Sequence, residues 1–187
     1  MRKVTSLGLL AALTLCGPAI AAEGISYSNV EVAYINAELD DVDVNGDGFG
    51  LSASGEFGEY AFGFINYNDI EYDAGVSGSE LSIGLGFHWP LTPTLDLVSG
   101  VSYEGFEVDV AGFGTAVDES GYGLSVGLRG RAGERVELSA SAKYLDFGDD
   151  GDDTKLTAGA RYYFSENLAA GVEIADQEGI TSWLISL

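Results

Sequence analysis

The segment ELSIGLGFHW, residues 80–89, carries the clearest signal of secondary structure in the sequence. Its apolar side chains fall at every second position, and the positions between them carry glycine, serine, glutamate and histidine. Successive side chains of a β-strand point to opposite sides, so a period of two residues is that of a strand with one apolar face. The stretch therefore predicts a strand whose two faces meet different surroundings.

The same alternation recurs in GYGLSVGLRGR at residues 121–131 and in RVELSASAKY at residues 135–144, and no segment shows a helical period. Short turns are expected after even-numbered strands and longer, acidic, glycine-rich loops after odd-numbered ones, except for a short turn after the ninth. This arrangement predicts an all-β, antiparallel, up-and-down transmembrane β-barrel. We expect ten strands, with eight as the alternative because the first and third have mixed parity, near residues 25–37, 48–57, 60–70, 79–90, 94–106, 119–131, 135–146, 154–164, 168–176 and 179–187.

The apolar face is expected to point outward into lipid, and the alternative is a soluble lipocalin-like barrel with that face inside. The other face consists of glycine, serine and charged residues, as a wet lumen would. Strands of about 9–11 residues suffice to cross a bilayer when tilted. Aromatic residues are expected near the strand ends as interfacial girdles: Phe57, Tyr60, Trp89, Phe164 and Trp183 on the short-turn side, and Tyr34, Tyr67, Tyr103, Tyr122 and Tyr144 on the loop side.

Residues 1–22 have the pattern of a secretory signal peptide, with Arg2 and Lys3 before a short apolar run and small residues at the end. Its removal leaves residues 23–187 as one domain and takes away the only cysteine, Cys16. The formal net charge then moves from −22 to −24, because two basic residues and no acidic ones are lost. So acidic a chain repels nucleic acid, and we expect no nucleic-acid partner.

The opening NVEVAYI (residues 29–35) and the hairpin LSIGLGFHWPLTPTLDLVSGVSYEGF (residues 81–106) resemble small outer-membrane β-barrel proteins of Gram-negative bacteria, of the porin-family or OmpX and OmpA type. The resemblance implies a location in the cell outer membrane, after export by the signal peptide. It also implies a monomer whose partners are outer-membrane lipids, lipopolysaccharide and the barrel-assembly machinery. Family members commonly end in an aromatic residue, whereas this sequence ends SWLISL.

Strand parity points a set of charged side chains into the lumen. The acids are Glu31, Glu56, Glu80, Asp96 and Glu104 on the first five strands, and the later strands carry Arg129, Lys143, Lys155 and Arg161 with Glu137 and Glu173. Charges inside a narrow barrel are costly unless they are paired. The pattern favours a salt-bridged plug that closes the lumen, and the alternative is a cross-pore field that filters ions.

The segment DVDVNGDG, residues 41–48, begins like a calcium loop of the EF-hand kind. The twelfth position of such a loop should be a bidentate glutamate and is Ser52, and the predicted flanks are strands, so an EF-hand is excluded. We expect an acidic outside loop, with a weak calcium or magnesium association at Asp41, Asp43, Asn45 and Asp47.

His88 is the only histidine, and it lies just before the turn at Pro90 without an activated nucleophile nearby in the sequence. No carboxylate pair stands out for acid–base chemistry, so the sequence predicts a non-enzyme without catalytic residues or cofactor. The favoured function is a membrane-structural or surface-interaction role with a closed lumen. The alternatives are a narrow ion-permeable porin and a soluble periplasmic ligand-binding barrel. We expect lumen-facing glycines such as Gly84 to tolerate serine.

Overall fold

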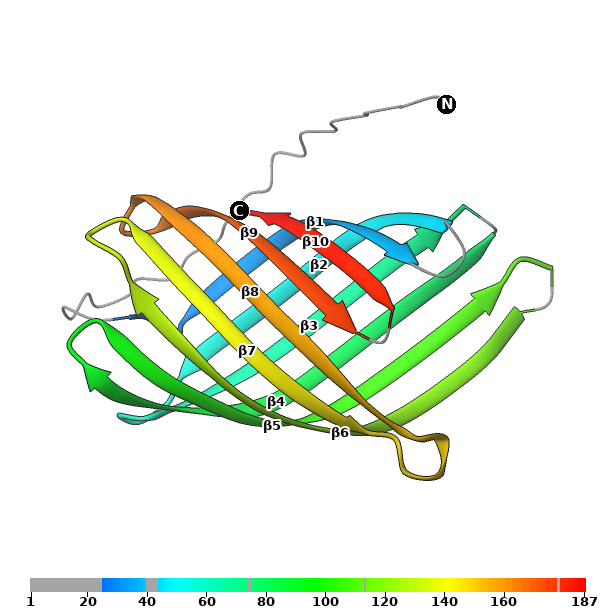
Figure 1. Cartoon of the computed structure of the whole chain (residues 1–187), viewed down its shortest axis with the longest axis horizontal. Coiled ribbons are helices and arrows are strands. Elements are labelled where there is room, and N and C mark those ends of the chain that lie inside the picture. The colour runs from blue at the N-terminus through cyan, green and yellow to red at the C-terminus, as the bar shows by residue number, and fades with distance from the viewer. Residues whose placement is uncertain (1–24, 40–43, 74, 113, 178) are drawn as a thin grey trace.

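The computed structural model describes residues 25–39, 44–73, 75–112, 114–177 and 179–187. Ten antiparallel strands form a closed barrel in which each strand pairs with its neighbours in sequence, and β1 closes on β10 (Figure 1). The prediction of an up-and-down barrel with ten strands is confirmed, and the alternative of eight is wrong. Within the described residues, no helix is long and apolar enough to cross a membrane. The strands are β1 (Asn29–Leu39), β2 (Val44–Glu56), β3 (Ala61–Tyr72), β4 (Val76–Thr92), β5 (Leu95–Val110), β6 (Gly114–Arg131), β7 (Val136–Asp146), β8 (Asp152–Ser165), β9 (Leu168–Gln177) and β10 (Ile180–Ser186).

The two ends of the barrel differ. The turns after β2, β4, β6 and β8 lie at the left in Figure 1, and we call this the short-turn end. The β3–β4, β5–β6 and β7–β8 hairpins reach to the right, at what we call the hairpin end. The β5–β6 hairpin extends well beyond β9 and β10, so the rim is uneven (Figure 1).

The acidic segments predicted as long loops are mostly strand. β5 continues to Val110 and β6 begins at Gly114, so most of residues 107–118 forms a hairpin. β6 has 18 residues. At about 3.3 Å per residue and a tilt of about 45°, such a strand rises about 40 Å, against an apolar band about 25 Å tall. The longest hairpins therefore extend about 15 Å beyond such a band, where both faces meet polar surroundings and composition no longer separates strand from loop.

The outer surface is apolar, and the lumen is polar. Leu85, Leu124, Val126, Val172 and Ile174 are among the large apolar side chains exposed on the outside. Serine, glutamate and basic side chains of the same strands face the lumen. This is the reverse of a soluble barrel that encloses an apolar ligand. One detail of the predicted girdles is wrong: Trp183 packs edge-on against Tyr34 with ring centroids 6.1 Å apart, so these two rings do not lie at opposite ends.

Two phenylalanines interrupt the polar lumen at the short-turn end of β3. Phe62 and Phe64 point inward and line the cavity, whereas Ile65, next along the strand, is exposed outside. Gly84 and Gly86 of β4 provide the space for these rings. A Cβ atom on Gly84 would lie 2.5 Å from Cζ of Phe64 and would also clash with the carbonyl oxygen of Val101. The expectation that Gly84 tolerates serine is therefore wrong.

Candidate functional site: the barrel lumen

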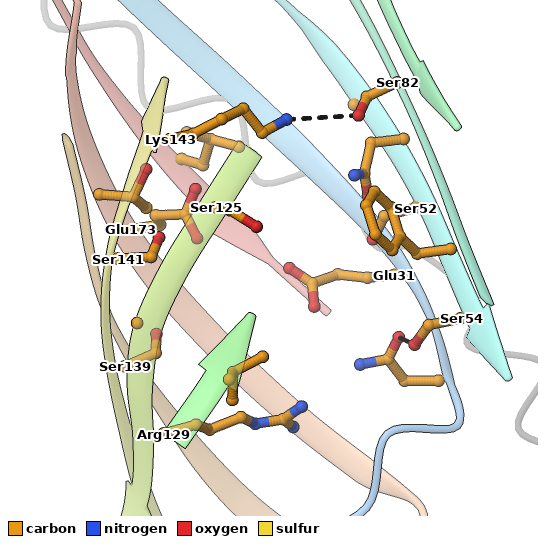
Figure 2. Close-up of a pocket in the computed structure, with 18 of the residues that line it drawn as sticks. Glu31, Ser52, Ser54, Ser82, Ser125, Arg129, Ser139, Ser141, Lys143 and Glu173 are labelled. Carbon is orange, nitrogen blue, oxygen red and sulfur yellow. Dashed lines mark hydrogen bonds between the residues drawn. The ribbon is translucent and has the colours of Figure 1, made fainter. Parts of the chain in front are cut away.

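A cavity of about 410 Å³ lies inside the barrel. Figure 2 shows serines from several strands around it, with the carboxylate of Glu31 projecting towards its centre. Among the described residues, four of these serines have no side-chain hydrogen bond in the protein and present their hydroxyls to the cavity: Ser52, Ser125, Ser139 and Ser141. A space of this size with polar walls holds water.

One ion pair with a buried carboxylate joins β5 to β7. Nζ of Lys143 donates to Oε1 of Glu104 at 2.9 Å, and Glu104 is only 2% exposed. The same carboxylate oxygen accepts hydrogen bonds from Oγ of Ser82 at 3.1 Å and from Oγ of Ser102 at 2.5 Å. Lys143 also reaches Ser82 on β4 at 3.3 Å, which is the dashed line in Figure 2.

Gly123 makes room for this pair. A Cβ atom at that position would lie 2.6 Å from Oε1 of Glu104 and 2.6 Å from Oγ of Ser102. A larger residue at Gly123 would therefore displace the carboxylate from its three donors.

A second ion pair spans the lumen between β8 and β4. Nζ of Lys155 lies 3.1 Å from Oε2 of Glu80, and Nδ2 of Asn68 donates to the same oxygen at 3.3 Å. Both charged side chains are about a quarter exposed to the cavity. Because β4 and β8 are not neighbours in the sheet, this pair ties opposite walls of the barrel together.

A third group of charges is centred on Glu137 of β7. Nε of Arg129 donates to its Oε1 at 2.8 Å, and Nη1 of Arg161 donates to the same oxygen at 3.4 Å. The hydroxyl of Tyr163 donates to Oε2 at 3.2 Å. Arg161 also forms an ion pair with Glu31 of β1. Two cations thus share one nearly buried carboxylate, and one of them reaches the first strand.

The remaining lumen acids differ in their surroundings. Glu173 of β9 lines the cavity and makes no ion pair or hydrogen bond within the described part of the chain. Glu56 lies exposed at the end of β2, where its Oε1 accepts a hydrogen bond from the backbone N–H of Tyr27 at 2.8 Å. Asp96 of β5 is buried at the short-turn end, with Nδ1 of His88 3.5 Å from its Oδ2.

Tyr27 is the residue of this site that the sequence did not reveal. The first strand was predicted to begin at residue 25, but β1 begins at Asn29, so residues 25–28 precede it. The Tyr27 side chain enters the lumen at the short-turn end, where it is 2% exposed and forms part of the cavity wall. Burial, followed by the hydrogen bond to Asp96, raises the pKa of the Tyr27 phenol, so it remains a hydrogen-bond donor.

The candidate metal ligands do not form one loop. β2 begins at Val44, so Asn45 and Asp47 lie in a strand, whereas Asp41 and Asp43 lie outside the described residues. In the part of the chain that the structure covers, no group of three or more acidic, histidine or cysteine side chains is arranged to hold a metal ion. The weak association of calcium or magnesium stays a prediction.

Comparison with protein families identifies a matching family. The model of the outer membrane protein beta-barrel domain matches residues 7–164, which is most of the chain. The chain belongs to this family. Its place among outer-membrane barrels agrees with the apolar outer surface and the polar lumen. No curated protein matches the sequence.

Several solved outer-membrane barrels are similar in fold. The KdgM porin is 12% identical, with 84% of this chain and 96% of that chain covered and a TM-score of 0.45. Neisserial surface protein A is 13% identical, covering 84% and 90%, with a TM-score of 0.41. The β-domain of the Bordetella autotransporter BrkA is 14% identical, covering 84% and 96%, with a TM-score of 0.44. Likeness at this level says nothing about what this chain binds or transports.

Proposed function

We propose that this member of the outer-membrane barrel family has a non-enzymatic, membrane-structural or surface-interaction role, with a lumen closed by its charged side chains. The observation that carries the proposal is the ion pair between Lys155 and Glu80, which lie on opposite walls of the barrel. Nζ of Lys155 is 3.1 Å from Oε2 of Glu80. A charged group inside a barrel that has a charged partner at this distance is more stable paired than exposed to passing ions. The ion pair of Lys143 on β7 with Glu104 on β5 is a second contact between strands in the lumen.

The hairpin end supports a role at the surface. Its projecting strands carry acidic side chains such as Glu71, Glu107, Asp109 and Asp118. Every basic residue of the domain lies in the lumen or at the short-turn end: Arg129, Arg131, Arg135, Lys143, Lys155 and Arg161. The rim therefore presents unneutralised negative charge, which favours cationic partners and divalent ions shared with lipopolysaccharide.

Channel recordings in planar bilayers test the closed lumen. The unmodified protein should give no conductance steps, and the double variant Lys155→Ala with Lys143→Ala should conduct, because it removes both cross-lumen cations. Leu156→Ala, at the neighbouring lipid-facing position of β8, is the matched control and should stay silent. Steady conductance of the unmodified protein would contradict a closed lumen.

A narrow porin is the second candidate, favoured by the 410 Å³ cavity and by Glu173, whose carboxylate has no cationic partner among the described side chains. Such a pore would select cations, and Glu173→Gln would weaken that selectivity. We further propose that residues 1–22 are removed on export. N-terminal sequencing of the membrane-bound protein tests this, and retention of Met1 would contradict it.

A further inference from the structure

The short-turn end of the lumen contains a pocket shaped for one phenol ring. The Tyr27 ring stacks on His88 with centroids 4.2 Å apart and an interplanar angle of 16°. It also stacks on Phe62 at 4.8 Å and 26°. The guanidinium carbon of Arg129 lies 4.7 Å from the ring centroid, at a distance suited to a cation–π interaction.

The pocket also recognises the hydroxyl group. The Tyr27 hydroxyl donates to Oδ2 of Asp96 at 2.9 Å, and both residues are buried. A buried carboxylate without a donor is costly, so Asp96 favours a ring with a hydroxyl over a ring without one.

Four neighbouring strands build the pocket. Phe62 lies near the start of β3, His88 near the end of β4, Asp96 near the start of β5 and Arg129 near the end of β6. The ring that fills the pocket comes from none of them, because Tyr27 precedes β1. Its segment is attached to the barrel wall by hydrogen bonds to the exposed end of β2: the backbone N–H of Tyr27 donates to Glu56, and that of Glu56 donates to Oγ of Ser28 at 3.0 Å.

The ring also forms part of the cavity wall, together with Phe62 and Arg129. Its partners His88 and Asp96 lie at the short-turn end, which faces the periplasm in the orientation expected of the family. Removing the ring would therefore take away part of the cavity wall at that end.

We propose that this pocket is a binding site for a phenol ring, that Tyr27 is its tethered ligand, and that the bound ring seals the cavity at the short-turn end. The sealing part rests on the closed lumen proposed above. The recognition part rests only on the contacts of Phe62, His88, Asp96 and Arg129 with the ring.

Chemical rescue tests the proposal in the full-length, membrane-inserted protein. Ser141 faces the cavity, so Ser141→Cys introduces a thiol there once Cys16, the only cysteine, has been replaced or removed. We expect Tyr27→Ala to raise the rate of modification by a small charged thiol reagent at least tenfold. Millimolar p-cresol should slow it again, while toluene, which lacks the hydroxyl, and cyclohexanol, which lacks the ring, should do so less.

Two variants provide the controls. Tyr27→Phe keeps the stacking but removes the hydroxyl, and it should give a rate between those of the parent and of Tyr27→Ala. Tyr162→Ala removes an aromatic ring from the lipid-facing surface of β8 and should leave the rate unchanged. The proposal is overturned if Tyr27→Ala leaves the rate unchanged, or if p-cresol acts no better than cyclohexanol.

Failure of the closed lumen is recognised separately. In that case, the parent protein with Ser141→Cys would already react fast and would conduct. The pocket is then tested by p-cresol binding to Tyr27→Ala, followed by NMR: saturable binding that Asp96→Ala abolishes supports the pocket, and no binding overturns it. If Tyr27→Ala folds poorly, refolding with and without p-cresol decides: a larger folded fraction with p-cresol supports the site, and an equal fraction contradicts it.

Discussion

Removing the ammonium group of Lys143 should destabilise the barrel strongly. Lys143→Met keeps the length of the side chain and leaves Glu104, whose side chain is 3% exposed, without its cation. Breaking a buried ion pair on one side costs about 3–5 kcal/mol. Because Ser82 and Ser102 still donate to the carboxylate, we expect the lower end, about 3 kcal/mol.

The reverse change should cost less. Glu104→Gln leaves the ammonium of Lys143, which is 19% exposed, in contact with cavity water and Ser82. Loss of the charged hydrogen bond alone should cost about 1.5–3 kcal/mol. In the double variant, neither residue leaves an unpaired charge. Its loss in free energy of unfolding should therefore be about 1–2 kcal/mol smaller than the sum of the two single losses.

The assay is reversible urea unfolding of the barrel in lipid vesicles, followed by the fluorescence of Trp89 and Trp183. The matched comparison is Lys155→Met with Glu80→Gln, whose side chains are 22% and 27% exposed and should therefore couple more weakly. If the single costs at the Glu104 pair add to the cost of the double variant within about 0.5 kcal/mol, the two charges are not coupled and the prediction is wrong.

Three further predictions concern the wall and the rim. Leu85→Arg places a charge on the lipid-facing surface and should cost about 2–4 kcal/mol near the midplane, measured by the same unfolding assay; an equal stability would contradict the outward assignment. Gly84→Ser should destabilise the barrel by more than about 1 kcal/mol, because its Cβ would overlap the ring of Phe64, and Phe64→Ala should recover part of that loss. Calcium and magnesium should produce the same shallow NMR response at the hairpin end, unchanged in Asp43→Ala, whereas saturable micromolar calcium binding that magnesium does not displace would establish a specific site.

Sequence patterns predicted the strands whose two faces differ in polarity. Residues 80–89 and 121–131 alternate cleanly because one face meets lipid and the other meets polar groups. β1 and β3 were ambiguous because Ile35, Phe62 and Phe64 are apolar on the lumen side. Where both faces are apolar, a period of two cannot be seen.

The lumen charges illustrate the same limit at the level of the site. Parity is enough to place Lys143 and Glu104 on inward faces, but their pairing depends on barrel size and strand stagger, which no local pattern contains. Tyr27 lies outside any strand, and its position depends on four strands that follow it in sequence. The conflict at Gly84 likewise depends on a ring from a neighbouring strand.

The seam between β1 and β10 has a mechanical consequence. Its ladder runs from Val32 to Leu39 on β1, and the ladder between β9 and β10 is similarly short, whereas the ladder between β5 and β6 extends along almost their whole length. Strand pairing is therefore shortest on the two sides of β10, so lateral opening towards the bilayer should start at this strand, and amide hydrogen exchange would report it first. The ion pair of Arg161 with Glu31 lies behind this seam and joins β8 to β1 past both strands of the last hairpin. The barrel wall can therefore separate at β10 only after the ion pair of Arg161 with Glu31 has broken.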